Sequence, residues 1–92
     1  MAKNKHDYTG LITELEKLTW PRLYLFKFIV NADNQKVAKV QSLASTETAE
    51  INLNTSKTGK FVSITIKEIM ISPEEVIAKY KEATKIEGLI AL

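Results

Sequence analysis

The chain of 92 residues contains no cysteine, which excludes disulfide bonds, thiolate zinc sites and a cysteine nucleophile. Histidine is nearly absent as well, because His6 is the only one and lies in a polar N-terminal stretch. Arginine is equally scarce, with Arg22 the only arginine among 13 basic residues. Because two-pronged recognition of phosphates and guanines favours arginine, the composition disfavours a specialised nucleic-acid reader.

No hydrophobic run has the length of a membrane span. The longest, LYLFKFIV, is interrupted by Lys27, whereas a membrane-spanning helix needs about 20 apolar residues. The opening sequence MAKNKHDYTG lacks the apolar core of a secretory signal. A net charge of +2 and a hydrophobic fraction of 45% are ordinary for a soluble protein. We therefore expect one soluble domain over residues 1–92 in the bacterial cytoplasm, without a membrane partner and with a flexible tail over residues 1–7.

Apolar spacing predicts two helices and a strand in the first half of the chain. Leucine-type residues follow helical spacing over residues 9–18. The Trp20-Pro21 pair ends that helix, because proline disfavours the helical conformation in the residue before it. A strand that is apolar on both sides follows over residues 23–30, which is typical of a central strand. A second helix is expected over residues 34–44.

The second half predicts a hairpin, a third helix and a last short strand. The first strand of the hairpin is expected to point Ile51 and Leu53 inward. Its turn is expected to use a positive φ at Gly59. The sequence SPEE is typical of a helix start, with Ser72 as N-cap and Pro73 at the first helical position. The sequence LIAL closes the chain as a strand.

This order, a helix followed by β-α-β-β-α-β, predicts an α+β fold of the ferredoxin-like type. Right-handed crossovers place two helices on one face of a four-stranded antiparallel sheet. The other face stays open unless the N-terminal helix, a second copy of the chain or a ligand covers it.

The open face and the hairpin loop beside it hold the candidate functional residues. Alternate residues of the first and third strands point to that face, and they form a mixed surface with an apolar centre. Such patches often mark interaction sites. The candidate interaction residues are Leu25, Lys27, Ile29, Ser56, Lys57, Gly59, Lys60, Phe61, Ser63, Thr65 and Lys67.

The stretch SKTGK is similar to the end of a phosphate-binding loop. Gly59 and Lys60 fit that motif, but Asn54 stands where its first glycine belongs and Phe61 follows the lysine. A phosphate-binding loop also precedes a helix, whose N-terminus helps to hold the phosphates, and here a strand follows. The pattern disfavours phosphate binding.

The same stretch can be aligned with the aromatic strand of an RNA-recognition fold. Lys57, Phe61 and Val62 match that eight-residue pattern. Gly59 and Ile64 stand where the pattern has aromatic residues, which stack on RNA bases. Weak RNA binding therefore remains only a third alternative, and a nucleic-acid partner is disfavoured.

Catalytic residues are not recognisable in the sequence. The carboxylates of Glu74 and Glu75 stand in a predicted first helical turn, where negative charge interacts favourably with the helix dipole. No serine or threonine has a recognisable base and orienting group. We expect no enzyme activity, no catalytic residue, no cofactor and no metal site.

Three stretches resemble the small bacterial YbeD family, a group of domains of unknown function. They are WPRLYLFKFIV, SKTGKFVSITI and VIAKYKEATKIEGLIAL, and the resemblance extends over residues 9–92. The matching positions are Pro21, Phe26, Lys27, Ser56, Gly59, Phe61, Ser63, Thr65 and residues 85–88. This sequence departs from the family at Phe61, where a tyrosine is common.

The resemblance implies a ferredoxin-like fold similar to the ACT-type regulatory domains of amino-acid metabolism. It implies no catalytic residues, because the family has no established activity. ACT-type ligand sites use a glycine in the first loop, and here that loop is NADNQ. The leading hypothesis is a non-enzymatic regulatory or protein-interaction module that binds a protein partner or a second copy as a homodimer. An ACT-like sensor of a small metabolite is the alternative.

Overall fold

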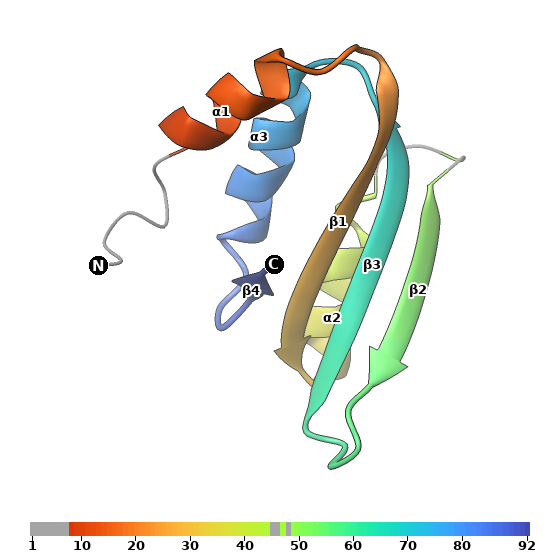
Figure 1. Cartoon of the computed structure of the whole chain (residues 1–92). Coiled ribbons are helices and arrows are strands. Elements are labelled where there is room, and N and C mark those ends of the chain that lie inside the picture. Colours follow the sequence, from red (N-terminus) through yellow and green to blue (C-terminus); the bar gives the residue numbers. More distant parts are fainter. Residues whose placement is uncertain (1–7, 45–46, 48) are drawn as a thin grey trace.

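Three helices and four strands follow one another in the predicted order within residues 8–44, 47 and 49–92, which the computed structural model describes. The predicted flexible tail lies outside these described residues. The elements are α1 (Thr9–Glu16), β1 (Arg22–Asn31), α2 (Asn34–Gln41), β2 (Glu50–Thr55), β3 (Phe61–Met70), α3 (Pro73–Ala83) and β4 (Ile90–Ala91) (Figure 1).

The four strands form one antiparallel sheet in the order β2-β3-β1-β4. The two longest strands, β1 and β3, lie in the centre and pair over ten positions. β4 is a short edge strand that pairs only with Phe28 and Ile29 of β1. These observations confirm the predicted α+β fold, which is compatible with a ferredoxin-like arrangement.

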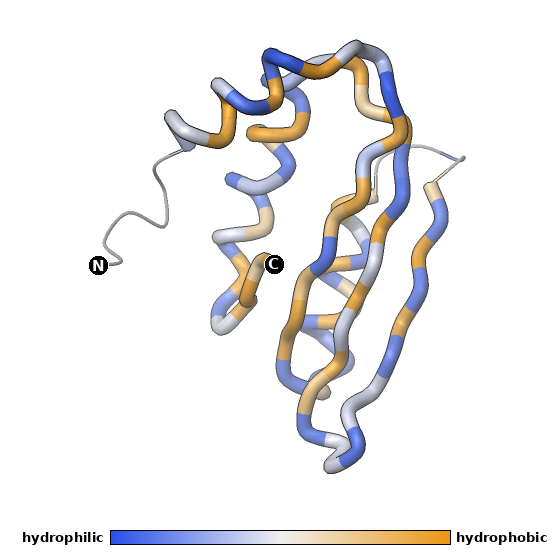
Figure 2. The backbone as a smooth tube through the Cα atoms, viewed as in Figure 1, coloured by the Kyte–Doolittle hydropathy of each residue, from blue (hydrophilic) through white to orange (hydrophobic). Residues whose placement is uncertain are grey.

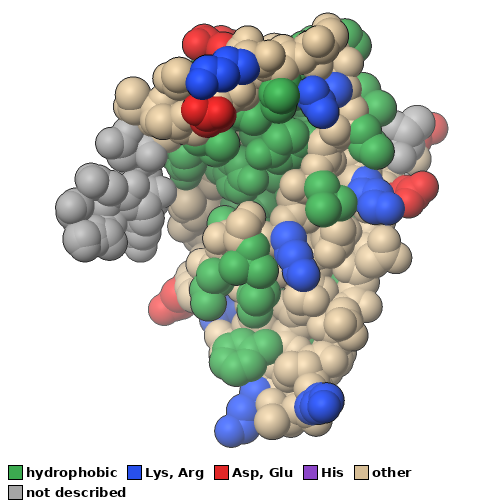
Figure 3. All heavy atoms as spheres, in the orientation of Figure 1, with side chains coloured by type: hydrophobic (Ala, Val, Ile, Leu, Met, Phe, Trp, Pro, Cys, Tyr) green, Lys and Arg blue, Asp and Glu red, His purple; other side chains and the backbone are tan. Residues whose placement is uncertain are grey.

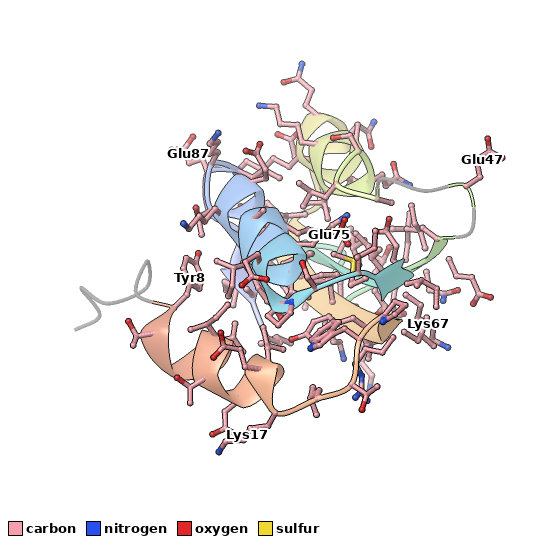
Figure 4. The ribbon with its side chains drawn as sticks, turned by 90° about the horizontal axis from the view of Figure 1, so that it is seen from above. Tyr8, Lys17, Glu47, Lys67, Glu75 and Glu87 are labelled. Carbon is pink, nitrogen blue, oxygen red and sulfur yellow. The ribbon has the colours of Figure 1, made fainter. Side chains whose placement is uncertain are left out.

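The hydrophobic core lies between one face of the sheet and the helices α2 and α3. Alternate residues of β1 and β3 point into it, and α2 and α3 close it from the other side (Figure 4). Burying these apolar side chains is the main favourable contribution to folding. The buried apolar residues are Leu15, Phe26, Phe28, Val30, Val40, Val62, Ile64, Ile66, Met70, Val76, Ile77, Ala83 and Ile86.

The helix α1 packs against α3 and leaves the open face of the sheet uncovered (Figure 1). It begins one residue after Tyr8 and ends at Glu16, two residues before the predicted end. Leu18 therefore lies beyond the helix and is 40% exposed, whereas Leu15 is buried. The Trp20 Nε1 group donates a hydrogen bond to the Leu15 carbonyl at 2.8 Å and holds the segment after α1 against the helix.

The apolar side chains of the edge strand β2 point to the predicted side of the sheet but are only partly covered. Apolar and polar residues alternate along it (Figure 2), and Ile51 and Leu53 pair with the buried Ile66 and Ile64, so they do point toward the helix side. The predicted inward orientation is therefore confirmed, although both side chains stay partly exposed, Ile51 at 36% and Leu53 at 49%. The reason is that α2 packs on β1 and β3, which leaves the edge strand outside the helix layer.

Local signals for the starts of α2 and α3 and for the hairpin turn agree with the structure, whereas α1 starts after Tyr8 without a side-chain cap. Ser72 caps α3 by accepting a hydrogen bond from the Glu75 amide at 3.2 Å, with Pro73 at the first helical position. Asp33 caps α2 in the same way. Gly59 has the predicted positive φ, at 76°. The helix α2 ends at Gln41, three residues before the predicted end.

Candidate functional site

The open face of the sheet is the surface formed by side chains that point away from α2 and α3. Residues directly opposite each other in antiparallel strands share a face, so the strand register defines its rows. Across β1 and β3 the rows are Leu23 with Ile69, Leu25 with Lys67, Lys27 with Thr65, and Ile29 with Ser63. Figure 4 shows Lys67 on the side of the strands away from α2 and α3. The predicted alternation of β1 and β3 is therefore confirmed.

Apolar side chains gather along the half of the open face that β1 and β4 form. The register places Ile90 opposite Ile29, and the Leu92 amide donates to the Lys27 carbonyl at 2.9 Å, which places Leu92 opposite Lys27. Leu25 is 54% exposed and Leu92 is 64% exposed. We name this set the apolar stripe; its members are Leu23, Leu25, Ile29, Ile69, Ile90 and Leu92.

The rest of the open face, on β2 and along β3 from Ser63 to Lys67, is polar. Its rows contain Asn52 opposite Thr65, Asn54 opposite Ser63, and Glu50 opposite Lys67. The hydroxyl of Ser63 donates to the Asn54 carbonyl at 3.4 Å. The open face is thus divided lengthwise into an apolar and a polar half.

Lysines stand at the middle of this divided face. Lys27 lies within the apolar stripe, between Leu25 and Ile29 along β1, and Lys67 lies opposite Leu25. Both lysines are exposed, and neither forms an ion pair with any residue that the structure describes. Figure 3 views this face and shows separate basic side chains among apolar patches. Their ammonium groups are available to a partner.

The predicted loop residues lie at one end of the face rather than on it. The hairpin turn holds Ser56, whose hydroxyl accepts a hydrogen bond from the Phe61 amide at 3.2 Å. The loop also carries the exposed side chains of Lys57 and Lys60. Phe61 stands opposite Asn31 in the last row of the face and is exposed. The structure therefore brings together the predicted strand residues and places the loop residues beside them.

Sequence reasoning missed a buried ion pair on the covered side of the sheet. The Lys79 ammonium of α3 lies 2.8 Å from a carboxylate oxygen of Glu68 on β3, and both side chains are almost fully buried. The same ammonium donates to the Leu43 carbonyl just after α2. The sequence does contain a signal for the burial of Glu68, because the alternation of β3 places it on the same face as the buried Ile66 and Met70. This pair ties β3, α3 and the end of α2 together.

A cavity of about 330 Å³ lies beside this ion pair, between α3 and the segment after α2. The Glu75 carboxylate at its wall accepts a hydrogen bond from the Ile71 amide at 2.8 Å. Among the described residues, no three His, Cys, Asp or Glu side chains are placed to share a metal ion. The lining residues are Ser42, Leu43, Glu75, Ala78, Lys79 and Glu82.

An aromatic cluster joins β1, α3 and the start of α1. The hydroxyls of Tyr24 and Tyr80 lie 3.4 Å apart, and Tyr8 stacks on Tyr80 with ring centroids 6.4 Å apart. Burial raises the pKa of Tyr80 well above its ordinary value, and the hydrogen bond with Tyr24 adds to the rise. Tyr24 is partly buried and packs against Phe26 of the core, so its ring is not displayed on the open face for base stacking.

Comparisons with known proteins place the chain in a family without adding a named relative. No described helix has the length and apolar character needed to cross a membrane. A search of curated proteins and a search of solved structures each found no match. A family model matches residues 15–92, which is most of the sequence. The chain therefore belongs to the family described as "protein of unknown function (DUF493)".

Proposed function

We propose that this protein is a non-enzymatic regulatory module that acts by binding another protein through the open face of its sheet. The observation that carries the proposal is the exposure of the apolar stripe. Several large apolar side chains lie side by side in water there, although most residues on the opposite face of β1 and β3 are buried. Covering such side chains is favourable by roughly 25 cal/mol for each Å² of apolar area removed from water.

The dimensions of the stripe suit a protein partner. Leu23 and Ile29 are six residues apart on β1, which corresponds to about 20 Å of strand. A standard protein interface buries about 800 Å² on each side. A stripe of this length, bordered by the polar half of the face, has the layout of such an interface, with an apolar centre and a polar rim.

Two matched variants test this proposal. Leu25→Asn removes an apolar side chain from the open face, and Leu53→Asn removes one of similar exposure from the opposite side of the sheet. We expect affinity purification from the source organism to recover a partner with the wild-type protein and with Leu53→Asn. Leu25→Asn should lose that partner, and with purified proteins its dissociation constant should rise at least about tenfold, or 1.4 kcal/mol.

The proposal fails if both variants retain the partner equally. Light scattering of the purified protein over a range of concentrations asks separately whether the partner is a second copy. A monomer mass throughout, with no partner recovered by the wild-type protein, would also contradict the proposal.

The cavity beside α3 favours a second candidate function, the ACT-like sensing of a small metabolite. Its volume of about 330 Å³ falls at the lower end of the range of small-molecule sites, about 300–1,000 Å³. A thermal-shift screen with amino acids tests this function. A ligand present at 100 times its dissociation constant should stabilise the fold by about 2.7 kcal/mol.

A variant that fills the cavity makes this test specific. Ala78 lines the cavity and is exposed, so Ala78→Phe should abolish the thermal shift without unfolding the chain. A screen without any shift, or a shift that survives in Ala78→Phe, would exclude the cavity as a sensor site.

A further inference from the structure

We propose that the partner contributes an acidic amphipathic helix, which lies along the apolar stripe with carboxylates at Lys27 and Lys67. This inference rests on the proposed function and specifies its partner. Three properties of the described residues support it: the charge of the face, the state of the sheet backbone and the position of the lysines within the stripe.

Charge is concentrated on the open face. Counting side chains alone, the face and its hairpin loop carry four exposed lysines, Lys27, Lys57, Lys60 and Lys67, against one carboxylate, Glu50. Four positive charges less one give +3, which exceeds the net charge of +2 for the whole chain. Opposite charge at an interface selects the partner and speeds association, so this face favours an acidic one.

The same charge disfavours a second copy of the chain packed face to face. In that arrangement Lys27 and Lys67 of one copy would approach the same lysines of the other. Juxtaposed like charges at an interface cost several kcal/mol. A partner with carboxylates beside its apolar residues avoids this repulsion and supplies the ion pairs that both lysines lack among the described residues.

The backbone of the sheet favours a helix over an extended peptide. The N–H and C=O groups of β1 and β3 lie in the plane of the sheet, so a partner on the open face meets side chains alone. β3 is paired along both sides, and β1 is paired on its β4 side at Phe28 and Ile29. A helix satisfies its own backbone hydrogen bonds and needs only side-chain contacts. Helices α2 and α3 already cover the other face in this way, and a partner helix would complete a three-layer arrangement.

The length of the stripe sets the size of the helix. A stripe of about 20 Å corresponds to about 13 helical residues at 1.5 Å each. Lys27 interrupts the apolar residues of β1, and Lys67 stands one row away, opposite Leu25. The helix should therefore carry leucine-type residues at three- and four-residue spacing, with acidic residues flanking that apolar side.

Two designed peptides provide the test. Both have 18 residues and the same leucine positions, with glutamate at the polar positions of one and lysine at those of the other. Titration of the full-length, ¹⁵N-labelled protein with the glutamate peptide should shift amide signals of β1, β3 and β4. The lysine peptide should bind at least about tenfold more weakly, or 1.4 kcal/mol.

Charge reversal makes the test specific. The double variant Lys27→Glu/Lys67→Glu should bind the glutamate peptide at least tenfold more weakly than the wild type does and the lysine peptide more tightly. Lys39→Glu/Lys81→Glu is the matched control, because Lys39 on α2 and Lys81 on α3 are exposed and lie on the covered side of the sheet. It should leave the preference unchanged. A well-dispersed amide spectrum shows that each variant remains folded.

Several results would overturn the inference. They are an absence of binding, equal binding of the two peptides, amide shifts confined to α2 and α3, and binding to phosphatidylserine vesicles in preference to the glutamate peptide. The natural partner separates this inference from the proposed function. If Leu25→Asn loses the partner and Lys27→Glu/Lys67→Glu keeps it, the interaction face stands and the acidic helix is wrong.

Discussion

Similar side chains are buried on one face of the sheet and exposed on the other. On the covered face, Phe26 and Phe28 are fully buried, and a carboxylate and an ammonium are buried with them as the Glu68–Lys79 pair. On the open face, Leu25 is more than half exposed, and the lysine opposite it has no ion pair among the described residues. Neighbouring residues of the same strands thus supply both surfaces.

The difference shows that exposure here follows from coverage and not from composition. β1 is almost as apolar on its open face as on its covered face. The helices α2 and α3 fill one side, whereas α1, the one described helix that could have covered the other, packs against α3. Apolar and charged side chains on the open face therefore remain in contact with water, whereas those on the covered face lose that contact when the chain folds.

The largest expected effect comes from truncating adjacent residues on opposite faces. Phe26→Ala should lower the free energy of unfolding by about 3–5 kcal/mol, because it leaves a cavity in the core. Leu25→Ala should change it by less than about 0.5 kcal/mol, because that side chain is already hydrated. Urea unfolding followed by circular dichroism measures both values. Similar losses at the two positions would contradict the division into a covered and an open face.

The charged groups of the two faces should differ as strongly. Glu68→Leu removes the carboxylate beside the buried Lys79 ammonium and should destabilise the fold by about 3–5 kcal/mol. Lys67→Ala, one residue away on the open face, should stay within about 0.5 kcal/mol of the wild type.

The double variant Glu68→Leu/Lys79→Met serves as the control for this pair. It removes both charges and should recover most of the stability lost in Glu68→Leu, because a buried ion pair can often be replaced by apolar residues without loss. A double variant as unstable as Glu68→Leu would show that the carboxylate contributes through something other than this pair.

A smaller effect is expected in the hairpin loop beside the open face. Gly59 has a φ of 76°, and a Cβ added there would meet no atom within 4 Å. Gly59→Ala should therefore cost roughly 1–2 kcal/mol from backbone strain alone. Gly10→Ala in α1, which also has free space, should instead stabilise the helix by up to about 1 kcal/mol. Equal effects in thermal unfolding would contradict this conformational account.

The smallest effect concerns the pH dependence of stability. Because the pKa of Tyr80 is raised in the folded protein, the folded chain keeps this proton at alkaline pH values where the unfolded chain has lost it. The contribution to stability is complete below about pH 10 and declines as the pH rises above it. Tyr80→Phe should make the decline shallower in urea unfolding between pH 9 and 11. Identical slopes for the two proteins would show that Tyr80 does not titrate with unfolding.

The candidate site was predictable where it depends on alternation. The period of two in β1 and β3 assigned Leu25, Lys27 and Ile29 to one face, and the register confirms that they meet Lys67, Thr65 and Ser63. The role of this face in binding stays a prediction. The additional apolar residues of β4 became visible only in the structure, because two residues are too short for a pattern to show their orientation.

The missed features share a non-local cause. The partial exposure of Ile51 and Leu53 was not predictable, because the pattern gives the side of a strand but not whether a helix lies over it. Glu68 and Lys79 were missed because charged residues are seldom fully buried, and the partners are eleven residues apart on different elements.

The sequence by itself determined the order of the elements, the caps of α2 and α3, the hairpin turn, and the face to which each residue of β1, β2 and β3 points, because these depend on neighbours a few residues away. The tertiary structure alone decided which face is covered, where α1 rests and which charges are paired. Those outcomes depend on how elements distant in the sequence pack together. The stripe of apolar residues beside Lys27 and Lys67 is therefore a product of the fold, assembled from an alternation that the sequence already contained.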